Sequence, residues 1–368
     1  MPFESRMRTL LAETPEQTRD RCLAEWLRLA GSDTPPIVLF GAGNLGRKVA
    51  RAMAGSGWRV VGFADNDSRK WGSEIESLPV YSPLDALQIA GPSACFIVTI
   101  WQGLGSHRYM ETRGQLLDLG AGHVAHAGHL GWRLPERIFP YYSMDHPIPM
   151  LASKDQIFQA LKRWDDSLSR DLFCRLVLWR LTLDFELLPE PDGRAEYFAP
   201  DLMPPRSGEI FIDGGAFDGD TTELFLSQWG EKAAGVHAFE PDPANIRAFQ
   251  ERFEQHPERA KVVLHPMALA AHEGDLAFDA EGTFASSATP KGKARVPCSS
   301  LDVLFKDLPF TFLKLDVEGG EMDALRGGRT VLGACSPRLA ICVYHTQGHL
   351  WEVPNLVDSV FPAGLPDF

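Results

Sequence analysis

Acidic side chains and glycines follow one short apolar run in the second half of the chain. Residues 210–212 form this run, Asp213 ends it, and a glycine-rich turn leads to a helix start. Glycine lets the backbone turn tightly and approach a ligand closely, and the helix start presents unpaired N–H groups. Acids at this turn disfavour a pyrophosphate and suit the sulfonium and ammonium groups of S-adenosylmethionine. The residues expected to contact this cofactor here are Asp213, Gly214, Gly215, Ala216, Phe217, Gly219, Asp220 and Thr221.

A second acid ends the next apolar run. Glu240 stands there, followed by Pro241 and Asp242. In a doubly wound sheet the carboxyl ends of the first two strands lie side by side. A carboxylate at this place can accept hydrogen bonds from both hydroxyls of a ribose, so we expect Glu240 to hold the cofactor's ribose. Pro241 and Asp242 complete the predicted cofactor site, and Asp242 is also expected to cap the following helix.

Three side chains are candidates for the chemical step. Asp316 and Glu318 follow the fourth predicted strand, and His345 ends the fifth. Methyl transfer to a hydroxyl is an in-line displacement that needs two reactants held together and a base for the hydroxyl proton. Each of the three could be that base. Carboxylates at strand ends also cap helices or pair with cations, so the sequence leaves the identity of the base open.

Alternating strands and helices would position these residues. From residue 209 on, the pattern predicts an α/β fold with a doubly wound sheet. Helices are expected to begin near Thr221, Pro243 and Gly320, and an insertion at residues 274–296 is expected to contain a short β excursion. The five predicted strands cover residues 209–213, 235–240, 261–266, 310–316 and 338–344.

The first half of the chain contains another glycine turn. Gly41-Ala-Gly-Asn-Leu-Gly46 follows an apolar strand in the G-x-G-x-x-G pattern, and Asp65 ends the next strand, where an acid can bind a ribose. This turn has no acids and is followed by Arg47 and Lys48, so it suits phosphates. A nucleotide or nucleotide-sugar is one interpretation, and a turn that binds no ligand is the other.

These patterns predict two Rossmann-like sheets joined by helices. Residues 1–130 would form an N-terminal helix and a Rossmann-like domain, residues 131–205 a largely helical connector, and residues 206–368 the cofactor-binding domain. His123, His126 and His129 are spaced three apart. Glycines interrupt any helix that would bring them together, and no acid or cysteine completes a site. No metal centre is therefore predicted at these histidines, whereas a divalent ion held by Asp316 and Glu318 is left open.

Composition limits the classes of function. The 368 residues have a net charge of −13, which argues against a broad grip on nucleic acid or on a membrane surface. The six cysteines form no C-x-x-C pair, which favours buried thiols over disulfides. Neither an apolar signal region nor a run of about 18 apolar residues is present, so the cytoplasm is the expected compartment.

Five motifs taken together resemble one family. They are residues 212–221, 239–243, 300–302, 313–321 and 343–345, which read IDGGAFDGDT, FEPDP, SLD, LKLDVEGGE and VYH. In this order they resemble the landmarks of FkbM-type methyltransferases that depend on S-adenosylmethionine. The resemblance spans about residues 205–360.

The resemblance implies a class I methyltransferase fold and O-methylation of a hydroxyl on a small-molecule, sugar, glycan or polyketide-like acceptor. It also implies that Asp213, Gly215 and Gly219 line the cofactor, that Glu240 holds its ribose, and that Asp316 lies at the methyl-transfer cleft. The first half is similar to the small Rossmann-like domains that precede transferase domains in sugar-modifying proteins.

The chain departs from the family pattern after the fifth strand. The resemblance implies a closing strand pair, whereas a helix reaching Phe361 is expected here, so the final hairpin is predicted to be missing. The fifth strand would then be an exposed edge, which a homo-oligomer, the N-terminal domain or a longer chain would cover. Two alternative functions stay open, an NAD-dependent oxidoreductase that uses the first glycine turn and a non-catalytic protein that binds S-adenosylmethionine or a nucleotide.

Overall fold

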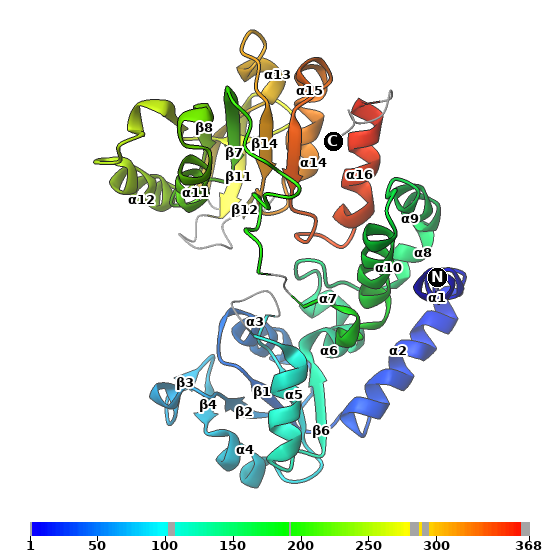
Figure 1. The fold of residues 1–368 in the computed structure, drawn as a ribbon. Coiled ribbons are helices and arrows are strands. Elements are labelled where there is room, and N and C mark those ends of the chain that lie inside the picture. The colour runs from blue at the N-terminus through cyan, green and yellow to red at the C-terminus, as the bar shows by residue number, and fades with distance from the viewer. Residues whose placement is uncertain (1, 102–106, 191–192, 280–286, 289–293, 362–368) are drawn as a thin grey trace. The chain divides into compact units, whose positions relative to one another are not determined.

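The computed structural model describes residues 2–101, 107–190, 193–279, 287–288 and 294–361. The chain divides into two compact units, Met1–Pro189 and Glu190–Phe368 (Figure 1). The predicted connector is shared between them, because its helices belong to the first unit and its residues from Glu190 on belong to the second.

The first unit is built on a six-stranded sheet in the order β3-β4-β2-β1-β5-β6. Only the pairing of β3 with β4 is antiparallel among these strands. The strands are β1 (Ile37–Phe40), β2 (Val60–Ala64), β3 (Glu74–Ile75), β4 (Leu78–Tyr81), β5 (Cys95–Val98) and β6 (His123–His126). The helices are α1 (Pro2–Leu11), α2 (Pro15–Ala30), α3 (Asn44–Met53), α4 (Pro83–Ala90), α5 (Tyr109–Asp118), α6 (Ala127–Arg133), α7 (Pro135–Ile138), α8 (Ile148–Ala152), α9 (Lys154–Leu161) and α10 (Ser167–Thr182), with 3-10 turns η1 (Ser68–Lys70) and η2 (Phe185–Leu187).

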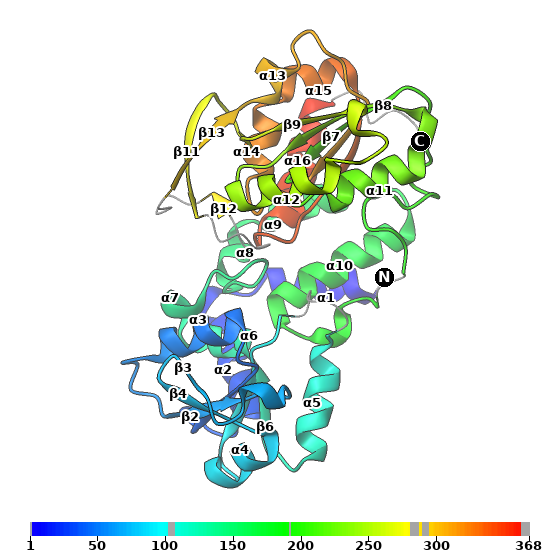
Figure 2. The same ribbon diagram turned by 90° about the vertical axis from the view of Figure 1, so that its left-hand side faces the viewer.

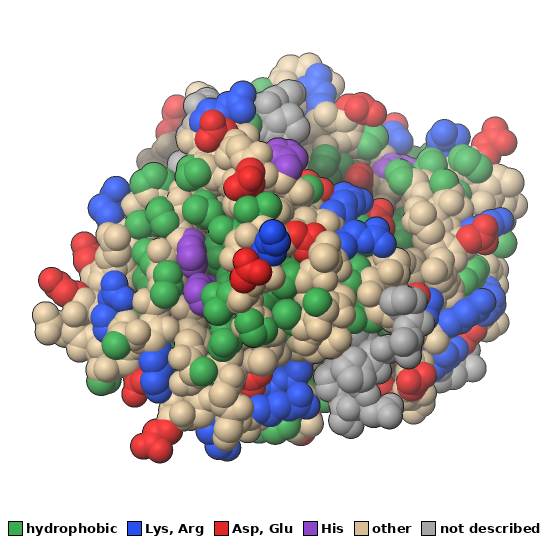
Figure 3. Space-filling view, turned by 90° about the horizontal axis from the view of Figure 1, so that it is seen from above, with side chains coloured by type: hydrophobic (Ala, Val, Ile, Leu, Met, Phe, Trp, Pro, Cys, Tyr) green, Lys and Arg blue, Asp and Glu red, His purple; other side chains and the backbone are tan. Residues whose placement is uncertain are grey.

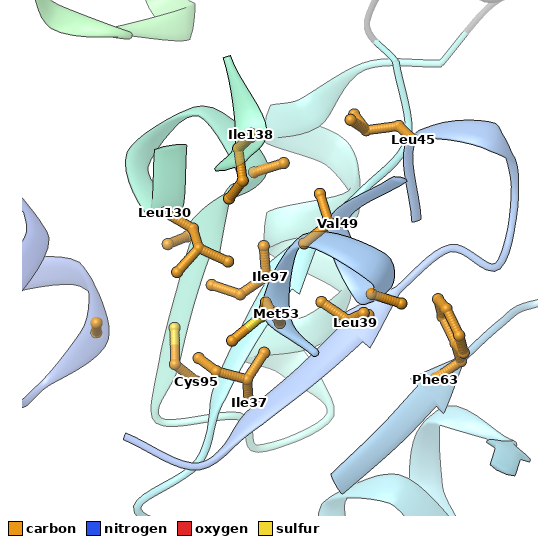
Figure 4. Close-up of a cluster of buried hydrophobic side chains, with 14 of the residues drawn as sticks. Ile37, Leu39, Leu45, Val49, Met53, Phe63, Cys95, Ile97, Leu130 and Ile138 are labelled. Carbon is orange, nitrogen blue, oxygen red and sulfur yellow. The ribbon is translucent and has the colours of Figure 1, made fainter. Parts of the chain in front are cut away.

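The core of the first unit forms where α3 packs on the sheet. Leu45, Val49 and Met53 recur at helical spacing and are buried against Leu39 and Ile97 of the strands (Figure 4). His123 and His126 lie on a strand, whereas His129 lies on α6 and its ring accepts the His126 backbone N–H. The three histidines therefore do not share the face of one helix.

The second unit contains a parallel five-stranded sheet in the order β15-β14-β7-β8-β9 and a separate four-stranded sheet in the order β10-β13-β11-β12 (Figure 2). The strands are β7 (Glu209–Gly214), β8 (Ala233–Phe239), β9 (Val262–His265), β10 (Ala268–Leu269), β11 (Gly274–Asp279), β12 (Ser287–Ala288), β13 (Ala294–Ser299), β14 (Phe312–Leu315) and β15 (Arg338–Ile341). The helices are α11 (Asp220–Trp229), α12 (Pro243–Phe253), α13 (Leu301–Leu304), α14 (Glu321–Arg326), α15 (Arg329–Cys335) and α16 (His349–Val360), with 3-10 turns η3 (Gly230–Lys232) and η4 (Arg259–Lys261).

Both faces of the five-stranded sheet are buried. Successive residues of a strand point to opposite faces, and here Phe211 and Phe312 join one apolar cluster while Ile212 and Leu313 join another. Helices therefore cover the sheet on both sides, which is the arrangement of a doubly wound α/β fold. The predicted fold class is confirmed, and all five predicted strands are present.

Some predicted details differ from the structure. Within the largely helical connector predicted for residues 131–205, α10 ends at Thr182, where Leu183 takes the left-handed conformation (φ 49°). The β excursion predicted in the insertion is a sheet of its own, and part of that insertion lies outside the described residues. β15 is an edge strand, and between it and Phe361 the described chain forms α16.

The surface carries charges of both signs. Acidic and basic side chains are interspersed with apolar ones over the face shown in Figure 3. Among the helices of the described residues, none combines the length and apolar character needed to cross a membrane.

Candidate functional site

A cavity of about 230 Å³ lies in the second unit at the carboxyl ends of β7, β8 and β14. Ligands of open α/β sheets bind at this edge. Eight of the predicted site residues line it, namely Gly215, Phe217, Asp220, Thr221, Glu240, Pro241, Asp316 and Glu318. Six others do not, namely Asp213, Gly214, Ala216, Gly219, Asp242 and His345.

Glu240 is held in a fixed orientation at the cavity wall. Its Oε2 accepts the backbone N–H of Phe217 at 3.0 Å, and its Oε1 accepts the backbone N–H of Asp242 at 2.8 Å and the side-chain amide of Asn245 at 3.3 Å. Burial raises the pKa of this carboxyl group, and the three hydrogen bonds oppose that rise. Glu240 thus joins the glycine turn to the end of β8 while still lining the cavity.

Asp213 lies behind the wall in a buried ion pair. Its carboxylate contacts Lys314 Nζ at 3.0 Å and accepts the hydroxyl of Thr222 at 2.7 Å, and neither charged side chain is more than 2% exposed. Lys314 Nζ also donates to the carbonyl of Gly215 at 2.7 Å. Asp213 therefore connects β7, β14 and α11, and it does not line the cavity.

The glycines of the turn are required by close packing within the protein. Gly215 has φ 77°, and a Cβ there would lie 1.9 Å from the carbonyl oxygen of Asp316. Gly219 has φ 90°, and a Cβ there would lie 2.7 Å from the ring of Phe253. At both positions the space that a side chain would need is taken by β14 or α12, and Gly215 also lines the cavity.

His345 lies among three carboxylates. Its Nε2 is 3.2 Å from Asp316 Oδ1 and 3.6 Å from Glu318 Oε2, and its Nδ1 is 2.8 Å from Glu321 Oε1. Burial lowers the pKa of His345, but Asp316 and Glu321 outweigh burial and raise the pKa to about 10. At neutral pH the ring is therefore an imidazolium.

The two cavity-lining acids of this cluster differ in acidity. Burial raises the pKa of Glu318 to about 7, against the attraction of His345. Burial also opposes ionisation of Asp316, but a hydrogen bond from His345 and the charge of Lys314 hold the pKa of Asp316 well below its usual range. Asp316 is thus a permanent carboxylate, while Glu318 exchanges its proton near neutral pH.

Asp316, Glu321 and His345 also form a set that could hold a metal ion, because one ligand atom of each lies within 4.8 Å of the others. However, His345 contacts Asp316 with one ring nitrogen and Glu321 with the other. In the structure these side chains contact one another directly, as in an ion-pair cluster.

Several cavity residues were missed by the sequence analysis. Tyr197 donates its hydroxyl to Asp316 Oδ2 at 2.8 Å, and its ring centroid lies 5.2 Å from Lys314 Nζ. Tyr197 and Glu196 come from an irregular segment without periodicity, so no local signal marks them. Lys314 does carry a signal, since a lysine inside a buried apolar strand requires an acidic partner.

The glycine turn of the first unit has a comparable acid. Asp65 Oδ2 accepts the backbone N–H of Ala42 at 2.9 Å and contacts Lys70 Nζ at 2.8 Å, while Oδ1 accepts the N–H of Asp67. A lysine therefore neutralises the acid that was predicted to bind a ribose, in contrast to Glu240.

The chain is similar to known proteins both in sequence and in fold. Residues 213–361 match the family model of the methyltransferase FkbM domain. The fold is similar to the crystal structure of methyltransferase FkbM from Methylobacillus flagellatus KT, with a TM-score of 0.75 and 18% identity over 98% of this chain and 92% of that one. A structure of RSP in complex with beta-NADH covers 38% of this chain and 69% of its own at 18% identity, and its TM-score of 0.22 carries no argument. No curated protein matches the sequence.

The likeness to the solved methyltransferase concerns the fold, because the identity is low. The family match falls on the part of the chain that contains β7, the glycine turn, Glu240 and the His345 cluster. Residues 213–361 are therefore similar to the methyltransferase FkbM domain, and this match supports a methyltransferase role.

Proposed function

We propose that the second unit transfers a methyl group from S-adenosylmethionine to a hydroxyl of a sugar, glycan or polyketide-like acceptor. The observation that carries this proposal is the acid-lined cavity at the carboxyl edge of the five-stranded sheet. The family match supports methyl transfer, and the charge and position of the lining residues support the cofactor. The hydroxyl acceptor follows from the resemblance of the motifs.

The lining residues suit a cationic ligand. Six carboxylates line the cavity against one ammonium group, and Asp213 already neutralises that ammonium. A phosphate would be repelled there, whereas a sulfonium and an amino group would be attracted. The carboxylates are Glu196, Asp220, Glu240, Asp316, Glu318 and Asp323.

Glu240 would hold the ribose hydroxyls, because its carboxylate stands at the end of β8. Asp220 and Thr221 line the cavity at the start of α11, where a methionine amino group would meet the carboxylate. When bound, S-adenosylmethionine would supply an electrophilic methyl group. Anionic acceptors would be disfavoured by the same carboxylates.

Glu318 is the base that the geometry supports best. It lines the cavity, and its pKa of about 7 suits a group that takes a proton near neutral pH. Asp316 is too weak a base, and His345 already carries a proton. Turnover should therefore rise as the pH rises through about 7, when Glu318 ionises, and fall through about 10, when His345 loses its charge.

The cofactor is tested by thermal shifts with S-adenosylmethionine, S-adenosylhomocysteine, NADH and a UDP-sugar. A ligand at 100 times its Kd should stabilise the protein by about 2.7 kcal/mol. We expect both adenosyl ligands to shift the melting temperature. Failure of both would contradict the proposal, and a shift with NADH alone would favour the oxidoreductase.

The ribose role is tested by Glu240→Ala, with Asp65→Ala as the matched control in the other unit. A hydrogen bond to a charged group contributes about 1.5–3 kcal/mol, so loss of the ribose contacts in Glu240→Ala should weaken S-adenosylhomocysteine binding by at least roughly tenfold. Asp65→Ala should leave the Kd unchanged in isothermal titration. Equal losses of affinity in the two variants would show that the ribose has been assigned to the wrong glycine turn.

A further inference from the structure

We infer that Glu321 is a positioning residue for the proposed methyl transfer. Its carboxylate holds the loop that presents Glu318 and also the ring of His345. The inference rests on the proposed function, since it concerns the groups assigned to that reaction. Glu321 itself does not line the cavity and is fully buried.

Glu321 holds the loop between β14 and α14 by hydrogen bonds to its backbone. Glu321 Oε1 accepts the backbone N–H of Val317 at 3.0 Å and that of Gly319 at 3.5 Å. These two residues flank Glu318, which has the left-handed φ of 51°, and Gly319 has φ 104°. A non-glycine residue in this region carries backbone strain. The two hydrogen bonds from its neighbours hold Glu318 in that conformation at the cavity wall.

Glu321 also orients the ring of His345. Glu321 Oε1 lies 2.8 Å from His345 Nδ1, and Oε2 lies 3.1 Å from His349 Nδ1 on α16. A carboxylate at one ring nitrogen fixes the orientation of an imidazole and stabilises its charged form. The opposite nitrogen of His345 is thereby directed at Asp316 and Glu318. A single buried carboxylate thus connects both sides of the proposed catalytic cluster.

The charge of Glu321 should control the charge of His345. The titratable groups around this ring are Asp316 and Glu318 from the loop, Glu321 from α14, His349 from α16 and the adjacent Tyr344. Burial opposes ionisation of Glu321, but His345 and His349 lower its pKa to about 2, so it is ionised wherever the enzyme would work. An amide in its place would keep the shape and remove the charge.

The test uses the full-length chain without ligand and the variants Glu321→Gln, Glu321→Asp and Glu352→Gln. Ring nitrogen shifts of ¹⁵N-histidine report the protonation of His345, assigned with His345→Gln. We expect His345 to stay protonated to about pH 10 in the wild type. Its midpoint should fall by at least one pH unit in Glu321→Gln and by less in Glu321→Asp. Glu352→Gln, the same substitution on α16, should leave it unchanged.

The pH profile of turnover gives a second measurement. In Glu321→Gln the alkaline limb of the profile should shift to lower pH together with the His345 midpoint. In Glu321→Asp it should return toward the wild-type pH. A wild-type His345 that titrates near pH 6.5 would overturn the inference without any variant, even if Glu321→Gln does not fold. A midpoint unmoved by Glu321→Gln would also overturn it. S-adenosylhomocysteine binding is measured in parallel. Binding by the wild type together with an unmoved His345 midpoint contradicts this inference alone, whereas no binding by the wild type contradicts the proposed function.

Discussion

A lysine and an aspartate at the ends of two neighbouring strands decide which charges face the cavity. Lys314 lines the cavity, but Asp213 and the carbonyl of Gly215 bind its ammonium group and offset much of its positive charge. The carboxylates of the lining keep their negative potential as a result. Under the proposed function, the pairing would therefore favour a cationic cofactor in addition to stabilising the fold.

Removing the lysine should be costly. Lys314→Met leaves the carboxylate of Asp213 buried without its partner, and breaking a buried ion pair in this way costs about 3–5 kcal/mol. The free energy of unfolding, measured in urea, should fall by that amount. Arg326→Met is the control, because its pair with Asp323 is more than half exposed and should contribute less than about 1 kcal/mol. Equal losses would show that the buried pair has no special cost.

The sequence identified individual acids better than it identified their partners. Glu240, Asp316 and Glu318 line the cavity as expected, because a carboxylate after an apolar strand is placed at the sheet edge by topology alone. Asp213 meets the same criterion but turns inward to Lys314. Tyr197 could not be predicted, since its position depends on how an irregular segment packs on β14.

At the level of elements, the turn between β7 and α11 fits closely against β14. The close approach of Gly215 to the Asp316 carbonyl leaves no volume for a side chain. The same contact brings the end of β7 beside the loop that carries Asp316 and Glu318. The glycine is therefore needed to assemble the cavity wall.

Gly215→Ala should destabilise the second unit. Alanine at a φ of 77° is strained, and its Cβ would collide with backbone, so the loss should exceed about 1 kcal/mol. Gly235→Ala in β8 is the control, because its Cβ would find its nearest neighbour at 3.7 Å. Chemical denaturation of the two variants checks this, and a loss in Gly235→Ala as large as that in Gly215→Ala would contradict it.

Strands with long apolar runs were predictable, and very short ones were not. β7 and β14 are buried almost throughout, and β7, β8 and β14 read as mainly apolar segments. β3, β10 and β12 have two residues each and leave no periodic pattern. Two residues are too few to show an alternation, wherever the partner strand lies in the chain, so that only the folded structure shows their pairing.

For the whole molecule, the charged cluster should make stability depend on pH. His345 has a folded pKa of about 10, above the value of about 6.5 expected in the unfolded chain. Its contribution to stability is therefore fully present below about pH 6.5 and is lost as the pH rises through about 10. Glu321 has a pKa lowered to about 2 from 4.5, so its contribution is lost as the pH falls through about 2.

Thermal melts at pH 6, 8 and 10 test this dependence. The melting temperature of the wild type should decline over this range, and burial of Glu318 adds to the decline below about pH 7, because its folded pKa is raised. His345→Gln should show a shallower decline, since it lacks the group that titrates near 10. If the melting temperatures of the two proteins declined in parallel, groups other than His345 would cause the pH dependence.

The left-handed backbone conformation of Glu318 lowers the stability of the protein, while its side chain supplies the proposed base. A non-glycine residue in this conformation costs about 1–3 kcal/mol, and the chain places a glycine directly after it but not at it. Glycine at residue 318 would relieve the strain and would also delete the carboxylate at the cavity wall. Selection for a more stable protein would therefore favour the loss of this acid, so a thermostable homologue that keeps it must gain its stability elsewhere.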